Sequence, residues 1–154
     1  MVIVNYWLMK SEPSAYSIDD LQREKTTIWD GVRNYQARNI LGEMKKGDLA
    51  FFYHSNCKPP AIVGLMEVIE TNIVDPTQFD RTSAYFDVKS TPEKPRWHTV
   101  KVKFKEKFAQ SLSLETLKQT FNSDDFLVVK KGNRLSVMPV NNTVAQEILQ
   151  LIRA

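Results

Sequence analysis

Residues 29 to 39 read WDGVRNYQARN and combine side chains that bind ligands more often than they fill cores. Trp29 offers a flat face on which a nucleobase can stack, and arginine offers paired, planar donors that match a phosphate. Gly31 permits a tight backbone path, so the free N–H groups of the following helix can face an anion. This chemistry favours recognition of a planar, negatively charged ligand. The alternative is that Trp29 anchors the core while Arg33 forms a surface ion pair.

Three further short patches carry polar or aromatic side chains at the ends of predicted elements. They are Lys10-Ser11-Glu12-Pro13 after one strand, Tyr53-His54-Ser55-Asn56 after another, and Pro95-Arg96-Trp97 at the end of a long loop. Their hydroxyl, amide, carboxylate and imidazole groups suit the edge of a planar heterocycle, which carries both donors and acceptors. Each patch also has a structural interpretation, as a capped turn, a polar hairpin turn or an aromatic plug.

Catalytic and metal-binding patterns are weak in this chain, which contains two histidines and one cysteine. His54 precedes Cys57 by three residues, and across a strand end that spacing points the two side chains to opposite faces. A structural zinc site needs four convergent ligands, which these residues do not supply. Neither a glycine-rich phosphate loop nor a G-x-S-x-G elbow occurs. We therefore predict no catalytic residue, no metal and no cofactor.

Composition limits the partners and the compartment. The 154 residues are 42% hydrophobic and 25% charged, with a net charge of +3, as in ordinary globular domains. No apolar run approaches the roughly 20 residues of a membrane span, and the N-terminus lacks the pattern of a signal peptide. We expect no membrane association and a cytoplasmic location, or a nuclear one in a eukaryote. The sequence does not determine the oligomeric state, for which a monomer is the default expectation.

The apolar patterns predict a single α+β domain over residues 1–154. Strands are expected at 2–10, 48–55, 61–74 and 98–108, and in the runs FLVVKK and RLSVMPV on either side of Gly132-Asn133. Helices are expected after the caps Ser17 and Asn34, over 111–121 and over 143–152. Residues 75–97 form a long loop. About six strands without regular βαβ alternation favour a mixed, mostly antiparallel sheet that closes toward a small barrel.

Four lysines alternate with apolar side chains along the fourth predicted strand. They are Lys101, Lys103, Lys105 and Lys107. Alternation places them together on one face of the strand. That face is either solvated or in contact with phosphates.

Eight blocks of the chain, in this order, resemble an EVE domain: YWLMKSEP, YSIDDL, WDGVRNYQARN, GDLAFFYHSN, IVGLMEV, DPTQFD, PRW and RLSVMPV. The resemblance runs from Asn5 to Val140. It implies a PUA-like fold, a twisted pseudo-barrel with short flanking helices that is related to YTH, ASCH and PUA modules. It also implies a pocket for a nucleobase, with modified bases in DNA or RNA as the expected ligands.

The same resemblance implies roles for particular residues. Trp29 and Trp97 would wall the pocket with aromatic rings. Polar contacts would come from three blocks and comprise Arg33, Asn34, Gln36, Lys10, Ser11, Glu12, Tyr53, His54, Ser55 and Asn56. Phosphates would be held by Arg33, Lys10 and some of the strand lysines. A Trp29→Ala variant is then expected to lose its preference for a modified base while the fold stays intact.

Two other functions stay open at this point. Relatives of the ASCH type suggest that such a pocket can hydrolyse a nucleoside-like amide or a modified base, with Glu12 and His54 as acid and base. The domain could also be a protein-interaction module without a nucleic-acid role.

Overall fold

Strands form where β-branched and aromatic residues gather, and helices begin directly after capping side chains. Residues 4–153 are described by the computed structural model. The strands are β1 (Tyr6–Ser11), β2 (Thr26–Ile28), β3 (Leu49–His54), β4 (Ala61–Val74), β5 (His98–Ser113) and β6 (Val137–Val140). The helices are α1 (Ile18–Glu24), α2 (Tyr35–Leu41), α3 (Leu114–Thr120) and α4 (Asn142–Arg153), with 3-10 turns η1 (Pro76–Phe79) and η2 (Leu127–Val129). Within this described range, no helix is long and apolar enough to cross a membrane.

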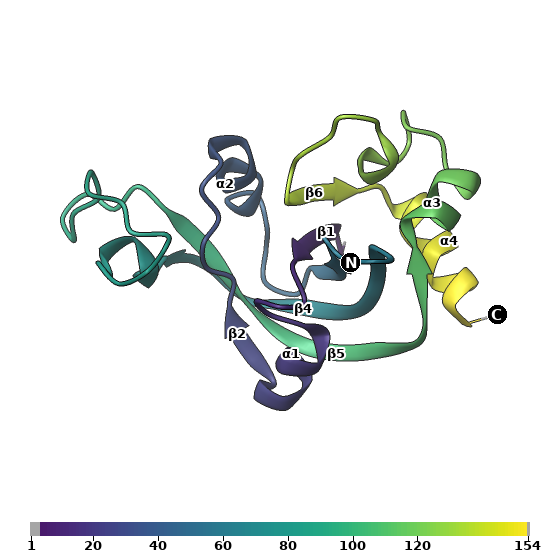
Figure 1. Cartoon of the computed structure of the whole chain (residues 1–154), viewed down its shortest axis with the longest axis horizontal. Coiled ribbons are helices and arrows are strands. Elements are labelled where there is room, and N and C mark those ends of the chain that lie inside the picture. The colour runs from purple at the N-terminus through teal and green to yellow at the C-terminus, as the bar shows by residue number, and fades with distance from the viewer. Residues whose placement is uncertain (1–3, 154) are drawn as a thin grey trace.

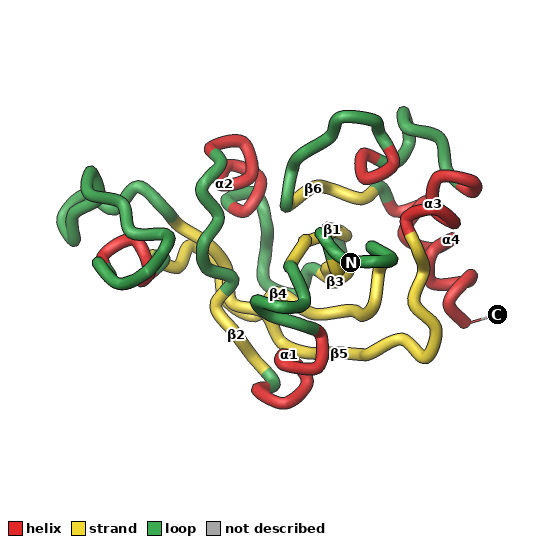
Figure 2. The backbone as a smooth tube through the Cα atoms, in the orientation of Figure 1, coloured by secondary structure: helices red, strands yellow, loops and turns green. Residues whose placement is uncertain are grey.

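The six strands form one curved sheet in the order β2-β5-β4-β3-β1-β6. Only the pair β1–β3 is parallel among these strands, so the predicted mixed, mostly antiparallel α+β fold is confirmed. The long strands β4 and β5 slip register at four places, and such bulges bend a strand and increase its twist. Figures 1 and 2 show the resulting curvature toward a barrel, with β2 and β6 left as edges.

Each face of the sheet buries its own hydrophobic core, because neighbouring side chains on a strand point to opposite faces. Leu8 and Phe51 belong to one core, which α3, η2 and α4 cover. Met9 and Phe52 belong to the other, which α1 and α2 cover. We call these the C-terminal core and the N-terminal core. In Figure 1 the two groups of helices lie at opposite sides of the sheet.

The two predicted helix caps are confirmed. Ser17 and Asp20 form a reciprocal capping box at the start of α1, which satisfies two backbone N–H groups that the helix leaves free. The side chain of Asn34 accepts from the N–H of Ala37, three residues into α2.

One strand prediction was wrong, and one short strand was not predicted. The run FLVVKK forms the turn η2 and not a strand; Val128 and Val129 are nevertheless buried, in the C-terminal core. Periodicity cannot separate a short apolar run of this kind from a strand. The sixth strand is instead β2, whose three residues TTI were too few to show a pattern and pair with the long β5.

The loop 75–97 is held in a defined shape by one buried side chain. The amide of Gln78 donates to the carbonyl oxygens of Asp75 and Trp97 and accepts from the N–H groups of Arg96 and Trp97. The loop packs on residues 29–33 through Tyr85, whose ring lies against Gly31. Gly31 has a φ of 82°, and an added Cβ would stand 2.7 Å from that ring. An alanine at this position would strain the backbone and force the exposed Tyr85 ring to shift.

Candidate functional site

Seven of the predicted contact residues meet where β1 and β3 end. Because the two strands are parallel, their carboxyl ends leave the sheet at the same edge, with Lys10 beside Tyr53 and Ser11 beside His54. The main chain continues this pairing, since the N–H of Ser55 donates to the carbonyl oxygen of Ser11 at 3.0 Å. We call this set the strand-end strip: Lys10, Ser11, Glu12, Tyr53, His54, Ser55 and Asn56.

The strip has two faces. Lys10 and Tyr53 lie on the side of the C-terminal core, with the ammonium 5.7 Å from the ring centroid. Burial lowers the pKa of Lys10 and raises the pKa of Tyr53 to about 12. His54 lies on the side of the N-terminal core, with its ring edge-on to Phe52 at 5.5 Å. A single ligand can therefore meet both sets only at the rim, where the strands end.

His54 is held in one tautomer by the start of α1. The N–H of Ile18 donates to its Nε2 at 3.1 Å, so Nδ1 carries the proton. Burial lowers the pKa of His54, which keeps the ring neutral near pH 7. A neutral imidazole in this state can donate a hydrogen bond from Nδ1. It could act as a general base through Nε2 only after its hydrogen bond to Ile18 breaks.

The rim of the strip is built from two turns that contact each other. The amide of Asn56 donates to the carboxylate of Glu12 at 3.1 Å. Asn56 has a φ of 53°, a left-handed conformation that asparagine adopts more readily than most residues. Glu12 also accepts two backbone N–H groups through its carbonyl oxygen, from Ala15 and Tyr16. The exposed amide and carboxylate are thus fixed side by side.

Trp29 belongs to the N-terminal core. Its side chain is 7% exposed and stands edge-on to Phe52, with ring centroids 5.4 Å apart. The main-chain N–H of Trp29 donates to the carbonyl oxygen of Val100. The expectation that Trp29→Ala leaves the fold intact conflicts with this burial, because deleting a buried indole opens a large cavity.

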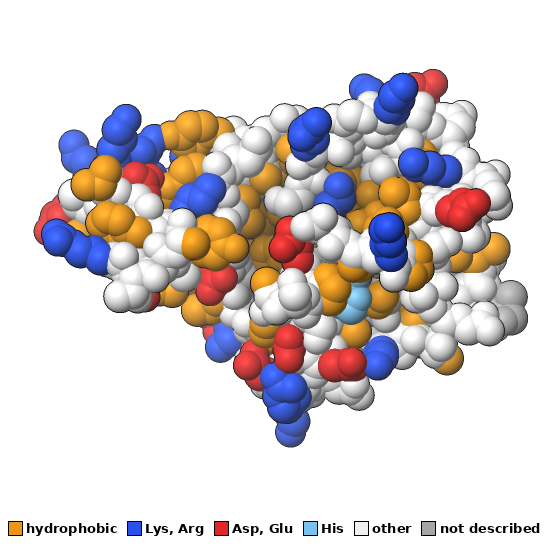
Figure 3. Space-filling model, viewed as in Figure 1, with side chains coloured by type: hydrophobic (Ala, Val, Ile, Leu, Met, Phe, Trp, Pro, Cys, Tyr) orange, Lys and Arg blue, Asp and Glu red, His pale blue; other side chains and the backbone are white. Residues whose placement is uncertain are grey.

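In Figure 3, hydrophobic side chains are visible in a depression between α2 and β6, with charged side chains at its rim.

The guanidinium of Arg33 is fully engaged within the protein. It pairs with the buried carboxylate of Asp75 at 3.1 Å and donates to Thr77 and to the carbonyl oxygens of Val32 and Tyr85. The same carboxylate accepts from the N–H of Gly31. Arg33 therefore fastens the loop 75–97 to the segment before α2. Its donors are already used, which weighs against a role in holding phosphate.

Trp97 lies in a separate stack of aromatic and arginine side chains. Its ring is parallel to that of Tyr35 within 12°, at 5.1 Å, and its indole N–H donates to Asp87 at 2.7 Å. That hydrogen bond is the first cause of the lowered pKa of Asp87. Three guanidinium groups lie over the two rings. We call this set the arginine–aromatic cluster: Arg33, Tyr35, Arg38, Arg96 and Trp97.

The remaining predicted residues lie between or beside these two regions. Asn34 caps α2 through its side-chain oxygen, and Gln36 is exposed in the first turn of that helix. Three of the four strand lysines pair with acids: Lys101 with Glu70, Lys105 with Glu67, and Lys107 with Asp19. These pairs favour the interpretation of the lysine face as a solvated surface.

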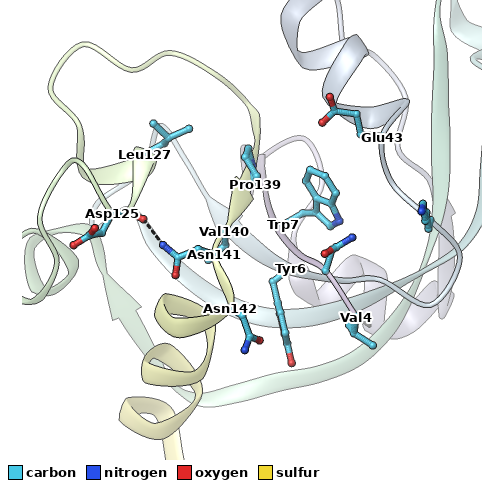
Figure 4. Close-up of a pocket in the computed structure, with 12 residues that line it drawn as sticks. Val4, Tyr6, Trp7, Glu43, Asp125, Leu127, Pro139, Val140, Asn141 and Asn142 are labelled. Atoms are coloured by element: carbon cyan, nitrogen blue, oxygen red, sulfur yellow. Dashed lines mark hydrogen bonds between the residues drawn. The ribbon is translucent and has the colours of Figure 1, made fainter. Parts of the chain in front are cut away.

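A cavity of about 930 Å³ lies at the other end of β1 and contains none of the predicted residues. Figure 4 shows it between β1, β6 and the start of α4. Its lining is Val4, Asn5, Tyr6, Trp7, Glu43, Lys45, Asp125, Leu127, Pro139, Val140, Asn141 and Asn142. The indole N–H of Trp7 is used by the buried carboxylate of Asp48 at 2.9 Å. Residues 4–153 contain no group of three His, Cys, Asp or Glu side chains placed to hold a metal ion.

Sequence patterns missed the residues that organise the arginine–aromatic cluster. The patterns indicate only that Tyr35 begins a helix and that Asp75 and Asp87 belong to a loop. One signal was present in the segment RNYQAR, where the spacing puts Arg38 on the same helix face as Tyr35. The partners from the loop 75–97 carry no comparable signal, because they lie about 40 to 60 residues away along the chain.

Comparison with known proteins identifies one family. The model of the EVE domain matches residues 5–151. Thymocyte nuclear protein 1 of Rattus norvegicus is 41% identical over 97% of this chain and 74% of the rat protein. The corresponding human protein is 39% identical over 96% of this chain and 73% of its own length.

Solved structures give the same relationship. A protein of Pseudomonas syringae is 48% identical, with a TM-score of 0.92 over 96% of this chain and 99% of that chain. The human THYN1 protein, crystallised in complex with 5-methylcytosine-containing DNA, is 38% identical, with a TM-score of 0.89 over 97% and 98% of the two chains. The YTH domain of Pho92 has a TM-score of 0.53 at 11% identity over 98% and 87% of the chains, a likeness of fold alone.

Proposed function

We propose that this chain, which belongs to the EVE domain family, binds nucleic acid and reads a modified base at the strand-end strip. The observation that carries the proposal is the human relative, whose structure contains DNA with 5-methylcytosine. The similarity spans nearly all of both chains, so the site-forming elements of the relative have counterparts in this chain.

The geometry of the strip supports base reading at its rim. Glu12, Ser55 and Asn56 offer a carboxylate, a hydroxyl and an amide at the point where β1 and β3 leave the sheet. These groups can pair with the edge of a heterocycle, and the neutral imidazole of His54 lies beside them. Behind these groups the buried rings of Phe52 and Trp29 stand edge-on to each other and support His54 from the side of the N-terminal core.

The expected selectivity follows from the energies involved. A base drawn out of a duplex loses a few kcal/mol of stacking and pairing. A methyl group in an apolar contact contributes about 1–3 kcal/mol, by analogy with methylene selection in enzyme pockets. The preference for a methylated over a plain base should therefore be tens to hundreds of fold.

A cytoplasmic or nuclear location and a monomeric state stay predictions.

The test is direct binding of fluorescent oligonucleotides that contain one 5-methylcytosine or one cytosine, as single strands and as duplexes. Asn56→Gly removes the rim amide, and glycine adopts the positive φ of this position without strain. Asn72→Gly is the matched control, because Asn72 has a φ of 55° on the exposed part of β4. We expect the wild type and Asn72→Gly to prefer the methylated oligonucleotide, and Asn56→Gly to lose at least about fivefold of that preference, as one polar contact is worth roughly 1 kcal/mol.

Equal binding of methylated and plain oligonucleotides by the wild type would contradict base reading. Mass analysis of the methylated oligonucleotide after incubation with the protein tests whether the protein hydrolyses the modified base. An unchanged mass is expected, and a loss of the base that depends on Glu12 would favour the hydrolase instead.

A further inference from the structure

The outer surface of the loop 75–97 and of the first turn of α2 combines exposed aromatic rings with basic side chains. Tyr35 is 49% exposed, Tyr85 43% and Phe86 36%. The exposed basic residues beside them along the loop are Arg81, Lys89 and Lys94. Figure 3 shows Lys and Arg side chains interleaved with hydrophobic ones on the lobe at the left, where Figure 1 shows this loop. We call this the loop surface.

Aromatic and cationic groups alternate through the layer beneath it. Arg33 lies 5.7 Å from the ring centroid of Tyr85 and 5.1 Å from that of Trp97. Trp97 stacks on Tyr35, and Arg38 lies 4.7 Å from the centroid of Tyr35. The layer is held in place by the buried Asp75 and by Asp87. The exposed phenol ring of Tyr35 therefore rests on a fixed support.

Arg38 differs from the two other arginines of the cluster because no carboxylate neutralises it within residues 4–153. Arg33 pairs with Asp75, and Arg96 pairs with Asp87 at 3.3 Å. Arg38 donates only to neutral oxygens, the carbonyl of Arg96 at 3.1 Å and the side chain of Asn39. These bonds orient the guanidinium without cancelling its charge, which is the condition for a preorganised phosphate contact.

We propose that the loop surface binds the strand that flanks the read base, with Arg38 on a phosphodiester group and an unstacked base on the ring of Tyr35. The inference rests on the proposed function and adds a second contact to it. A fixed aromatic ring beside an unneutralised cation is the arrangement that holds single strands without regard to sequence. Trp29 contacts Phe52, whose ring contacts His54 of the strip. Because Trp29 and Tyr35 are six residues apart, their Cα atoms lie within about 22 Å, close enough for one short strand to reach both regions.

The experiment compares four variants in the same oligonucleotide assay at several salt concentrations. Arg38→Gln removes the charge and Tyr35→Ala removes the ring, while Tyr35→Phe keeps the ring. Lys118→Gln is the charge-matched control, on the exposed last turn of α3 in the C-terminal half. A free 5-methylcytosine nucleoside is the probe that has no flanking strand.

Arg38→Gln should weaken methylated and plain oligonucleotides alike and reduce the salt slope by about one. Tyr35→Ala should weaken both at least about fivefold, the lower end of one stacked base, and Tyr35→Phe should restore the affinity. Lys118→Gln should bind like the wild type. All four variants should bind the free nucleoside as the wild type does, and their preference for the methylated base should not change.

The outcomes separate the two proposals. If Arg38→Gln and Tyr35→Ala bind oligonucleotides with wild-type affinity and salt slope, the loop surface is not a strand contact. If these variants lose affinity but the wild type does not distinguish methylated from plain strands, base reading fails and the loop surface stands. If the wild type binds no oligonucleotide at low salt, both proposals fail, and the aromatic surface then favours a protein partner.

Discussion

The strand-end strip and the arginine–aromatic cluster hold their side chains by different means. On the strip, the backbone register of β1 and β3 sets which residues stand side by side, and only a few side-chain hydrogen bonds refine the arrangement. In the cluster, side chains hold one another across two segments with no shared strand pairing, through Arg33, Asp75 and Trp97. A substitution on the strip should therefore act locally, whereas loss of Arg33, Asp75 or Trp97 should loosen a whole loop.

The two tryptophans give the largest test of this difference. Trp29→Ala should reduce the free energy of unfolding by about 3–5 kcal/mol, as for other deletions of buried aromatic rings. Trp97 is as buried as Trp29, but its indole packs on the loop and on Tyr35 outside both cores. Trp97→Ala should therefore loosen the loop and cost less globally, about 1–2 kcal/mol. Chemical unfolding measures the first effect. Hydrogen exchange over residues 75–97 should rise in Trp97→Ala, and equal exchange in the two variants would contradict the distinction.

Substitutions of two arginines five residues apart should differ in their effect on stability almost as much as the two tryptophan substitutions do. Arg33→Gln leaves the carboxylate of Asp75 buried without its cation, so we expect a loss of about 2–3 kcal/mol. Arg38→Gln breaks no ion pair and should change stability by no more than about 0.5 kcal/mol. Thermal unfolding of the two variants at one ionic strength measures the difference. Similar losses would mean that Arg38 is also a structural cation, against its assignment to a phosphate.

Glycine substitutions isolate the docking of Tyr85. Gly31 and Gly47 both have a positive φ, and an added Cβ meets the Tyr85 ring at Gly31 but nothing within 4 Å at Gly47. Each alanine variant should lose about 1–2 kcal/mol from backbone strain. Gly31→Ala should lose more, and only this variant should increase hydrogen exchange in the loop 75–97. Equal effects at both positions would show that the docking of the Tyr85 ring does not require the absence of a Cβ at Gly31.

The smallest expected effect is a pH dependence that belongs to the strip alone. Burial lowers the folded-state pKa of His54 below its ordinary value of 6.5. Between the lowered pKa and 6.5 the unfolded chain carries a proton that the folded chain does not, so stability falls as the pH drops through and below 6.5. His54→Gln keeps an acceptor for the N–H of Ile18 and should flatten this part of the curve. His98→Gln serves as the control, and a wild-type-like curve for His54→Gln would exclude His54 as the titrating group.

Local signals in the sequence predicted the parts of the fold that depend on near neighbours. The caps Ser17 and Asn34 act within three residues, so their types and spacing were sufficient. The parallel register of β1 and β3 could not be predicted in this way, because about 40 residues separate the strands and neither carries a mark of its partner. The run FLVVKK shows the converse error, since burial alone gave it the composition of a strand.

The predicted site residues divide in the same way, into those placed by strand pairing and those placed by distant side chains. The sheet brings together seven residues at the ends of two strands, and their contact with a base stays a prediction. Trp97 went to a different region, because the position of a loop residue depends on partners such as Asp87 and Gln78 that the pattern does not reveal. The buried position of Trp29 depended on the depth of the N-terminal core, which its neighbours in the sequence did not indicate.

The place of β1 within the sheet has a consequence for biosynthesis. This strand hydrogen-bonds to β3 on one side and to β6 on the other, and Val137 is translated 131 residues after Tyr6. At typical elongation rates that interval is roughly 7 to 26 s. During it, Lys10 and Ser11 stand on a strand with one open edge. The nascent chain therefore completes the sheet around β1 only when its last strand arrives, and a premature stop before residue 137 would release a chain with an unpaired strand edge.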